Sequence, residues 1–507
     1  MTRLTIMLIA TLVAAPALAT QETDTSCRNV YRLTDTVYAV EPGVLVPATD
    51  ALPAHCRVRG VVNRAIRFEV TMPVADWNGR LMFSTVGGAA GTLGDTTSLL
   101  GRGFAMATTD TGHEVQDTGF MRRPEALLDY AYRGVHLATQ VTKVVITRYY
   151  GRDIDHAYLK GCSNGGRSAL LEATRFPEDY DGIIAGAPLF RFQEFVPWAI
   201  AGGRLQRAHP LTEASLQLLD DASRDACDLL DGVDDGVIND PRACTEDHFN
   251  VNTLECAPGQ REGCLTPGQL ETARYMYDGL VDATGKVISP GVLPGAEAAG
   301  DWAFWMLPNA LVGDEPDSLI GSMEQTLTDL MRHDPTFDVE GFDPVVDWHT
   351  LTNAMSPLDV GTADLSEFRA RGGKLLMYQG WNDYPLRPGR ALDYLAEIER
   401  ESGGAADAAG FVRLFMVPGM VHCAGGPGPW QADYVDPLVA WRERGTAPER
   451  IVGTQPGPAE LDHLAGTPDG QGDAQTFTRP LCVYPKQAEY TGEGDVRDER
   501  NFRCVAK

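Results

Sequence analysis

The sequence predicts an α/β fold, and three observations carry that prediction. Short apolar strands alternate with helical patterns over residues 65–189 and again over 374–417. A glycine-rich turn, G-C-S-N-G-G-R at 161–167, joins a predicted strand to a predicted helix. The chain has 507 residues, more than one hydrophobic core usually organises, so we expect two lobes or one domain with a large insertion. Alternating strands and helices indicate a parallel sheet with helices on both faces.

The first half of the chain supplies five of the predicted strands. In chain order these strands are at 65–74, 80–86, 103–109, 156–160 and 180–188. Helical patterns cover 127–150, which ends at Gly151, and 167–175. Asn78 and Gly79 form a dipeptide typical of a hairpin turn between the first two strands. Residues 20–60 are expected to be irregular.

The pattern changes after Leu189. Residues 190–355 hold four clustered cysteines and several tryptophans but few strand–helix alternations, and we interpret them as an inserted lid domain with a calcium site. The alternation resumes with strands at 374–379 and 412–417 and a helix between them at 389–399. The tail from Gly453 is expected to be loop-rich. The predicted domains are a signal peptide at 1–19, a core domain at 20–189 and 356–507, and the lid at 190–355.

The N-terminus and the charge restrict where the protein acts. Arg3, an apolar run at 4–15 and the small residues A-L-A at 17–19 are typical of a secretory signal peptide. No other segment has about 20 uninterrupted apolar residues, so we expect a soluble protein secreted to the periplasm or beyond, with no membrane contact after cleavage. The net charge of −27 argues against nucleic-acid binding. It is typical of a soluble exported protein, and a field that attracts cationic substrates is the alternative.

Ser163 lies in a G-x-S-x-G motif between a strand and a helix, the context of a nucleophile elbow. Such a turn crowds the backbone, so small residues are needed around the serine, and Gly161, Gly165 and Gly166 provide them. The turn exposes the hydroxyl and directs the first helical N–H groups toward it. The alternative is an ordinary glycine-rich turn with a capping serine.

Ser163, Asp383 and His422 occur in the chain order of the α/β-hydrolase fold, and each follows a predicted strand. Ser163 would be the nucleophile, His422 its general base, and Asp383 the group that orients the imidazole. His113 is the rival base because it also follows a strand. The oxyanion hole is expected to use the Asn164 N–H and one N–H from a small-residue loop at Gly87 and Gly88.

Ten cysteines in an exported chain favour disulfides. Proximity in sequence suggests four local pairs: Cys27–Cys56, Cys227–Cys244, Cys256–Cys264 and Cys482–Cys504. Cys162 and Cys423 remain, and they flank the proposed nucleophile and base. If Ser163 and His422 are within hydrogen-bonding reach, their neighbours could lie within the Cα separation of a disulfide, about 4.4–6.8 Å.

These residues carry a specific resemblance. Cys162-Ser163, Asp383 and His422-Cys423 match the CS-D-HC pattern of the tannase and feruloyl esterase family, which includes bacterial mono(2-hydroxyethyl) terephthalate hydrolases. The blocks G-C-S-N-G-G-R, Y-Q-G-W-N-D and P-G-M-V-H-C also resemble that family, and the likeness covers the whole mature chain. It implies an α/β-hydrolase core, a serine esterase mechanism, aromatic-acid ester substrates and the five disulfides.

An acidic loop at 227–240 predicts a structural Ca²⁺ site. So many carboxylates in a short loop repel one another unless a cation lies among them, and hard oxygen ligands suit calcium. A solvated acidic loop is the alternative. The family resemblance implies side-chain ligands from Asp228, Asp231 and Asp235 and carbonyl ligands from Val233 and Val237. No organic cofactor is expected.

The sequence therefore predicts a secreted serine carboxylesterase that hydrolyses feruloyl- or galloyl-type esters through an acyl-enzyme. A terephthalate half-ester hydrolase is the alternative with the same mechanism, and a non-catalytic binding module is the alternative from another class. Four lid residues are possible substrate contacts or lid core: Trp302, Phe304, Trp305 and Arg332. The sequence leaves the oligomeric state open.

Overall fold

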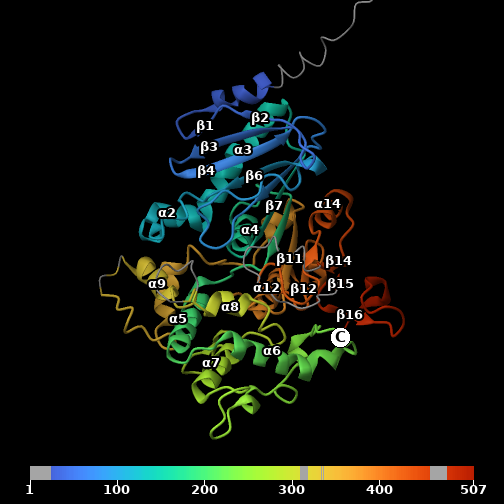
Figure 1. Cartoon of the computed structure of the whole chain (residues 1–507). Helices are drawn as coiled ribbons and strands as arrows, with labels where there is room; N and C mark the ends of the chain where they lie inside the picture. Colours follow the sequence, from blue (N-terminus) through green and yellow to red (C-terminus); the bar gives the residue numbers. More distant parts are fainter. Residues whose placement is uncertain (1–23, 309–317, 333, 335, 457–476, 507) are drawn as a thin grey trace, which may run out of the picture.

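The structure is a computed structural model, and it describes residues 24–308, 318–332, 334, 336–456 and 477–506. Figure 1 draws the chain with its blue N-terminal strands at the top and its green and yellow helical region below. The predicted signal peptide at 1–19 lies outside the described residues. Within the described ranges, no helix is both long and apolar enough to cross a membrane.

A ten-stranded sheet runs through the upper and central parts of the molecule (Figure 1). Its order is β1-β3-β4-β6-β5-β7-β8-β11-β12, with β2 paired to β3. The strands are β1 (Tyr38–Val40), β2 (Val44–Val46), β3 (His55–Val62), β4 (Ile66–Pro73), β5 (Arg80–Ser84), β6 (Ala105–Thr109), β7 (His156–Cys162), β8 (Gly182–Gly186), β11 (Lys374–Gly380) and β12 (Val412–Val417). The strands from β6 to β12 in this order are parallel, whereas β4, β3, β1 and β2 pair antiparallel.

Two expectations about the N-terminal part were wrong. The described part of the 20–60 segment, from residue 24 on, is not irregular, because β1, β2 and most of β3 lie there and extend the sheet with antiparallel strands. Asn78 and Gly79 do not form a hairpin, because β5 pairs with β6 and β7 rather than with β4. The Asn78 side chain instead donates to the Arg102 carbonyl at 2.8 Å, so the dipeptide joins two loops.

Side chains alternate between two apolar layers along the central strands, as the pleat requires. On one face, Leu81 and Phe83 of β5 are buried with residues of α3 (Gly134–Tyr150), α4 (Asn164–Arg175) and α12 (Pro388–Ser402). On the other, Met82 is buried with residues of α14 (Val435–Arg444). The long helix predicted at 127–150 forms with a π-helical segment, Asp129–Arg133, between α2 (Pro124–Leu128) and α3.

A helical region occupies the chain between β8 and β11 and lies below the sheet in Figure 1. Its elements are α5 (Phe192–Ala208), α6 (Glu213–Cys227), α7 (Pro267–Asp278), β9 (Leu280–Val281), β10 (Val287–Ser289), α8 (Asp301–Met306), α9 (Met323–Met331), α10 (Thr352–Met355) and α11 (Ser366–Ala370). Trp198 and Trp302 are fully buried in an apolar core formed largely by this region. The boundaries given above for the lid stay a prediction.

The C-terminal part contains more regular structure than the loop-rich tail we expected. A three-stranded sheet is formed by β13 (Gln431–Ala432), β14 (Arg450–Gln455) and β15 (Phe477–Cys482). A hairpin of β16 (Lys486–Tyr490) and β17 (Phe502–Ala506) follows it, and the short α13 (Ala405–Ala408) precedes β12. The ten cysteines form the five pairs predicted from the sequence: Cys27–Cys56, Cys162–Cys423, Cys227–Cys244, Cys256–Cys264 and Cys482–Cys504.

Candidate active site

Ser163 lies at the sharp turn between β7 and α4. Its backbone has φ 63° and ψ −126°, a conformation that a residue with a side chain rarely adopts. Hydrogen bonds on both sides maintain it: the Ser163 N–H donates to the Gly186 carbonyl at 3.0 Å, and the Arg167 N–H donates to the Ser163 carbonyl at 2.9 Å. The serine is therefore held outside both regular elements, as a nucleophile elbow requires.

The glycines around Ser163 are required by close backbone contacts. A Cβ atom at Gly161 would lie 1.9 Å from the Thr85 hydroxyl oxygen. A Cβ atom at Gly166 would lie 2.3 Å from the Gly186 carbonyl oxygen. Both distances are far below a van der Waals contact, so only glycine lets β7 and α4 approach their neighbours this closely.

Asp383 and His422 form the hydrogen-bonded pair expected of an acid and a base. Asp383 follows β11, is fully buried, and its Oδ2 lies 2.9 Å from Nδ1 of His422. Gln379 donates to the same carboxylate oxygen at 2.9 Å, and the Leu386 N–H donates to the other at 2.8 Å. These contacts fix the carboxylate, so that Asp383 can orient the imidazole and stabilise its protonated form.

Burial and charge act in opposite directions on the pKa of His422. Burial lowers the pKa, whereas the charge of Asp383, its hydrogen bond and the nearby Asp301 raise it, and the net pKa lies above the ordinary value for histidine. A base with this pKa must lose its proton before it can accept one from a serine. Activity that depends on His422 therefore decreases as the pH falls through this raised pKa.

A disulfide joins the elbow to the loop that carries His422. Cys162 and Cys423 are 261 residues apart in sequence, and their Cα atoms lie 6.0 Å apart. The Cys423 Sγ atom also lies 3.7 Å from Nε2 of His422. Since Ser163 and His422 are the immediate neighbours of the bridged cysteines, the bridge brings the three candidate triad residues to one place.

The predicted oxyanion loop lies beside Ser163. A Cβ atom at Gly87 would be 3.6 Å from the Ser163 Cβ, whereas one at Gly88 would have nothing within 4 Å. The Asn164 side chain donates to the Val86 carbonyl at 3.1 Å and thereby ties this loop to α4. The Asn164 N–H lies in the first turn of α4, where helical N–H groups lack intrahelical partners. Gly87 therefore lies beside the serine, and the oxyanion role of Asn164, Gly87 and Gly88 stays a prediction.

His113, the rival base, has a different environment. Its Nε2 lies 2.7 Å from the Ala89 carbonyl oxygen, and its ring stacks on Phe120 at 3.7 Å between centroids. Burial lowers its pKa. The His113 ring contacts the predicted oxyanion loop at Ala89 and the Phe120 ring. It has no hydrogen bond to a carboxylate among the described residues, unlike His422, so His113 supports the loop at Ala89.

The four lid residues singled out from the sequence differ in their surroundings. Trp302 is 2% exposed and belongs to the apolar core of the helical region. The Trp305 ring packs edge-to-face near the His422 ring, with 6.4 Å between centroids. Phe304 is 38% exposed, and Arg332 is also exposed. Trp305 is therefore the lid aromatic that the structure places beside the base.

The acidic loop gathers oxygen groups of the kind that could hold a divalent cation, and the calcium site stays a prediction. Asp231, Asp235, Val233 and Val237 line one pocket, and Oδ1 of Asp228 is buried without a hydrogen-bond partner among the described residues. The net pKa of Asp231 is raised to about 6, mainly by burial and also by the nearby aspartates, against the lowering effect of the hydrogen bond from the Val233 N–H. A hard cation would remove this desolvation cost.

The predicted calcium loop is also anchored to the rest of the chain. Cys227–Cys244 closes it, and the guanidinium of Arg479 on β15 pairs with Asp235. The Asn239 side chain donates to the Ala488 carbonyl on β16 at 3.0 Å. The loop thus connects the helical region to the C-terminal strands.

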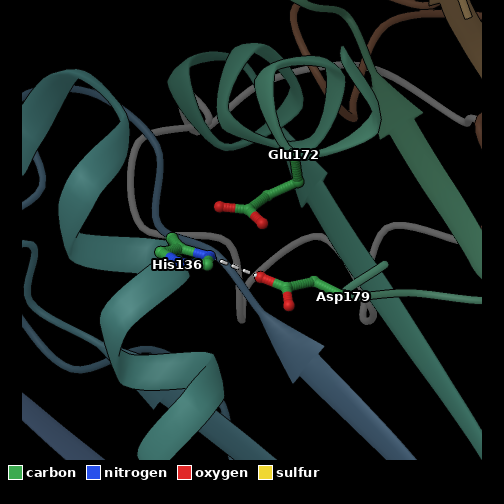
Figure 2. A group of neighbouring side chains, drawn as sticks. All are labelled: His136, Glu172 and Asp179. Carbon is green, nitrogen blue, oxygen red and sulfur yellow. Dashed lines mark hydrogen bonds and ion pairs between the residues drawn. The ribbon is translucent and has the colours of Figure 1, made fainter. Parts of the chain in front are cut away.

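A second group of possible metal ligands is formed by side chains of α3, of α4 and of the segment before β8 (Figure 2). His136 of α3, Glu172 of α4 and Asp179 before β8 point toward one another, and His136 Nδ1 lies 2.7 Å from Asp179 Oδ2. Gln140 also donates to Asp179, and the Lys143 ammonium lies 3.9 Å from its Oδ1. Burial, together with Asp179, raises the pKa of Glu172 well above its ordinary value. With an ammonium group already present, this cluster fits a protonated Glu172 better than a metal ion.

Two residues of the site were not predicted from the sequence. Arg167 is fully buried in α4 and binds the Asn164 side chain together with carbonyl oxygens of distant segments. The position of Arg167, four residues after Ser163, was the one indication in the sequence that it belongs to the site. Asp301 lies 121 residues before His422, yet it accepts a hydrogen bond from the His422 backbone. Nothing in the sequence distinguishes Asp301 from the other acidic residues.

Comparisons with known proteins identify the family and the fold of this chain. The family model of tannase and feruloyl esterase matches residues 52–505. The mono(2-hydroxyethyl) terephthalate hydrolase of Piscinibacter sakaiensis is 34% identical, over 91% of this chain and 87% of its own. A probable feruloyl esterase B of Aspergillus clavatus is 30% identical, over 89% and 86%. The crystal structure of feruloyl esterase B from Aspergillus oryzae aligns with a TM-score of 0.80 and 25% identity, over 95% of this chain and 100% of that one.

The mixed sheet, the helices on both faces and this structural match define an α/β-hydrolase-type fold, which confirms the predicted fold class. The class of protein is a carboxylic ester hydrolase, as the sequence predicted. The chain belongs to the tannase and feruloyl esterase family.

Proposed function

We propose that this chain is an exported serine esterase that hydrolyses esters of aromatic acids through an acyl-enzyme. One observation carries the proposal: a hydrogen-bonded Asp383–His422 pair is bridged by Cys162–Cys423 to the turn that bears Ser163. A strained serine beside an oriented histidine is the arrangement that activates a hydroxyl for attack on an ester carbonyl.

The chemistry follows from these positions. The Ser163 oxygen attacks the ester carbonyl carbon while His422 accepts the serine proton at Nε2, and Asp383 stabilises the imidazolium through Nδ1. The N–H groups of Asn164 and Gly87 would donate to the oxyanion of the tetrahedral intermediate. His422 then returns the proton to the departing alcohol. Water, deprotonated by the same histidine, hydrolyses the acyl-enzyme and releases the acid.

The aromatic acyl group is supported by the relatives and by Trp305. Two relatives are named for esters of aromatic acids, a feruloyl esterase and a mono(2-hydroxyethyl) terephthalate hydrolase. The Trp305 ring, near His422, offers an apolar face close to the reacting centre. Feruloyl- or galloyl-type esters are our first proposal. The 34% identity to the terephthalate half-ester hydrolase favours half-esters as the second candidate.

Calcium and export complete the proposal. Asp228, Asp231 and Asp235 would bind Ca²⁺ through side chains, and Val233 and Val237 through carbonyls, so that the ion holds the loop rather than takes part in the reaction. Export is supported by the signal-like residues at 1–19 and by the five disulfides, which persist in oxidising compartments.

Hydrolysis of a small ester panel tests the proposal. The purified protein and Ser163→Ala are assayed, with calcium present, on methyl ferulate, methyl gallate, mono(2-hydroxyethyl) terephthalate and p-nitrophenyl acetate. We expect turnover of an aromatic ester that falls by roughly 10⁴-fold or more in Ser163→Ala, because the nucleophile is lost. Turnover of the half-ester alone would select the second candidate. Turnover of p-nitrophenyl acetate alone would reject the aromatic specificity, and no turnover by folded protein would favour a binding module.

A further inference from the structure

One carboxylate of the helical region contacts both loops that carry the acid and the base. Asp301 is the first residue of α8 and is 8% exposed. Its Oδ2 accepts the N–H of Tyr384 at 3.0 Å and the N–H of His422 at 3.2 Å. Tyr384 directly follows Asp383 in the chain. A single oxygen atom therefore connects the backbones on which the acid and the base are mounted.

Further contacts show that this is a built junction. The side chain of Asn382, which precedes Asp383, donates to the Pro294 carbonyl at 2.9 Å. The Asn382 N–H donates to the Met420 carbonyl at 3.1 Å. This hydrogen bond joins the loop after β11 that carries Asp383 (the acid loop) directly to the loop after β12 that carries His422 (the base loop). Three small apolar side chains seal the same junction: Ala296, Ala299 and Val421. The segment that ends at Asp301 thus fixes both loops through polar and apolar contacts.

The charges around Asp301 give it an electrostatic role as well. The groups that face it are Asp383 and Tyr384 from the acid loop and His422 from the base loop, and the buried Arg387 lies near Asp383. The net pKa of Asp301 is about 7, because burial and the charge of Asp383 raise it more than His422 and the backbone hydrogen bonds lower it. In its ionised form Asp301 adds a second negative charge beside Asp383, and both then stabilise the imidazolium that forms when His422 takes a proton.

We propose that Asp301 is a positioning residue of the triad, supplied by the inserted helical region. It holds the backbones of Tyr384 and His422 in register and stabilises the imidazolium formed when His422 accepts the Ser163 proton. The helical region is then a structural part of the triad and not only a cover over it. This inference rests on the proposed serine esterase function.

Two substitutions separate the hydrogen bonds of Asp301 from its charge. Asp301→Asn keeps an oxygen that can accept both N–H groups but removes the negative charge, whereas Asp301→Ala removes both. For p-nitrophenyl acetate we expect Asp301→Asn to lower kcat by about tenfold with little change in KM. Its acidic limb of kcat/KM should shift by about half a pH unit or more to lower pH, because the imidazolium loses a stabilising charge. Asp301→Ala should lower kcat by roughly 100-fold or more.

Asp329→Asn is the matched control. Asp329 is also a buried aspartate of the helical region, but it lies on α9 and pairs with Arg122. We expect this variant to keep the acidic limb and the kcat of the parent protein. Melting curves of each variant report folding, and if Asp301→Ala does not fold, the pH profile of Asp301→Asn decides.

The outcomes distinguish this role from the proposed function. A parental kcat and acidic limb in Asp301→Asn would overturn the role of Asp301, as would an equal loss in Asp329→Asn. A loss of kcat in Asp301→Asn without a shifted limb would show a merely structural contact and also overturn it. If Ser163→Ala retains activity in the same assay, the proposed function itself fails.

Discussion

Two residues of the site adopt backbone conformations that side chains rarely tolerate. Ser163 has φ 63° and Cys423 has φ 66°. Such conformations cost about 1–3 kcal/mol each and persist where the surroundings over-determine them. Here the Ser163 N–H is bound by the Gly186 carbonyl, and the Cys423 side chain is fixed by its disulfide. The strain therefore lies at the nucleophile and next to the base, where the fold must direct two side chains toward one point.

At the same scale, the orienting role of Asp383 is testable. In Asp383→Asn, the amide nitrogen can donate to Nδ1 of His422 and favour the wrong tautomer, so we expect kcat to fall by about 10³- to 10⁴-fold. The measurement is kcat on p-nitrophenyl acetate with a melting curve. Asp393→Asn, an exposed change on α12 at a residue paired with Arg390, serves as control and should leave kcat unchanged. A loss below tenfold would show that Asp383 does not orient the base.

At the scale of elements, the elbow is fixed from two sides. Thr85, which follows β5, donates to the Lys160 carbonyl at 3.1 Å and to the Gly165 carbonyl at 3.0 Å, so the neighbouring strand clamps the turn. The Cys162–Cys423 disulfide then ties the turn to the loop after β12. The catalytic geometry thus depends on strand ends held in register, which the parallel pairing of the strands provides.

Removal of this bridge should affect catalysis more than folding. For the double change Cys162→Ser and Cys423→Ser, we expect kcat to fall by about tenfold or more, because the two loops lose their mutual restraint. The far-UV circular dichroism should be retained, with a lower melting temperature. The matched control is Cys256→Ser with Cys264→Ser, a bridge across 8 residues in the helical region, which should leave kcat unchanged. Full kcat in the first variant would exclude a positioning role for the bridge.

At the scale of the whole molecule, a series of contacts connects the loop that carries His422 to the helical region and to the C-terminal strands. The helical region contacts the His422 loop through Asp301. The predicted calcium loop packs close to the same loop: a Cβ atom built on Gly419 would lie 3.1 Å from the Val237 side chain. The C-terminal strands contact that calcium loop through Arg479. Restraints on the calcium loop can therefore reach the position of His422 through packed contacts.

Calcium removal tests this connection. We expect chelation to lower the melting temperature and added Ca²⁺ to restore it, because ligand binding to the folded state stabilises by mass action, about 2.7 kcal/mol at 100 times the dissociation constant. Asp231→Asn should weaken this response, and Asp221→Asn, on α6 outside the loop, should not. The measurement is a melting curve at several calcium concentrations. A melting temperature independent of calcium and chelator would show that the acidic loop is merely solvated.

Much of the fold was predictable because short stretches of the sequence mark the strands and the turns that end them. The strand β12 at 412–417 was predicted with its observed bounds, and β4, β5, β7 and β11 within a few residues, since apolar runs and turn residues mark them. The antiparallel strands β1 and β2 were missed because each has only three residues, and β3 was missed because two arginines and a glycine interrupt its apolar pattern. The prediction of a hairpin at 78–79 was wrong because pairing between strands that are distant in the sequence outweighed the local turn preference of Asn78 and Gly79.

The sequence by itself determined the class of fold and the order of Ser163, Asp383 and His422, because motif spacing records them, and it suggested four disulfides through the proximity of their cysteines in the chain. Only the tertiary structure decided which distant groups meet those residues. It placed Asp301 on the backbones of Tyr384 and His422, Arg167 on the Leu358 carbonyl, and Trp305 beside the base. The physical reason is that a hydrogen bond or a ring contact depends on separation in space, which positions far apart in the sequence do not record.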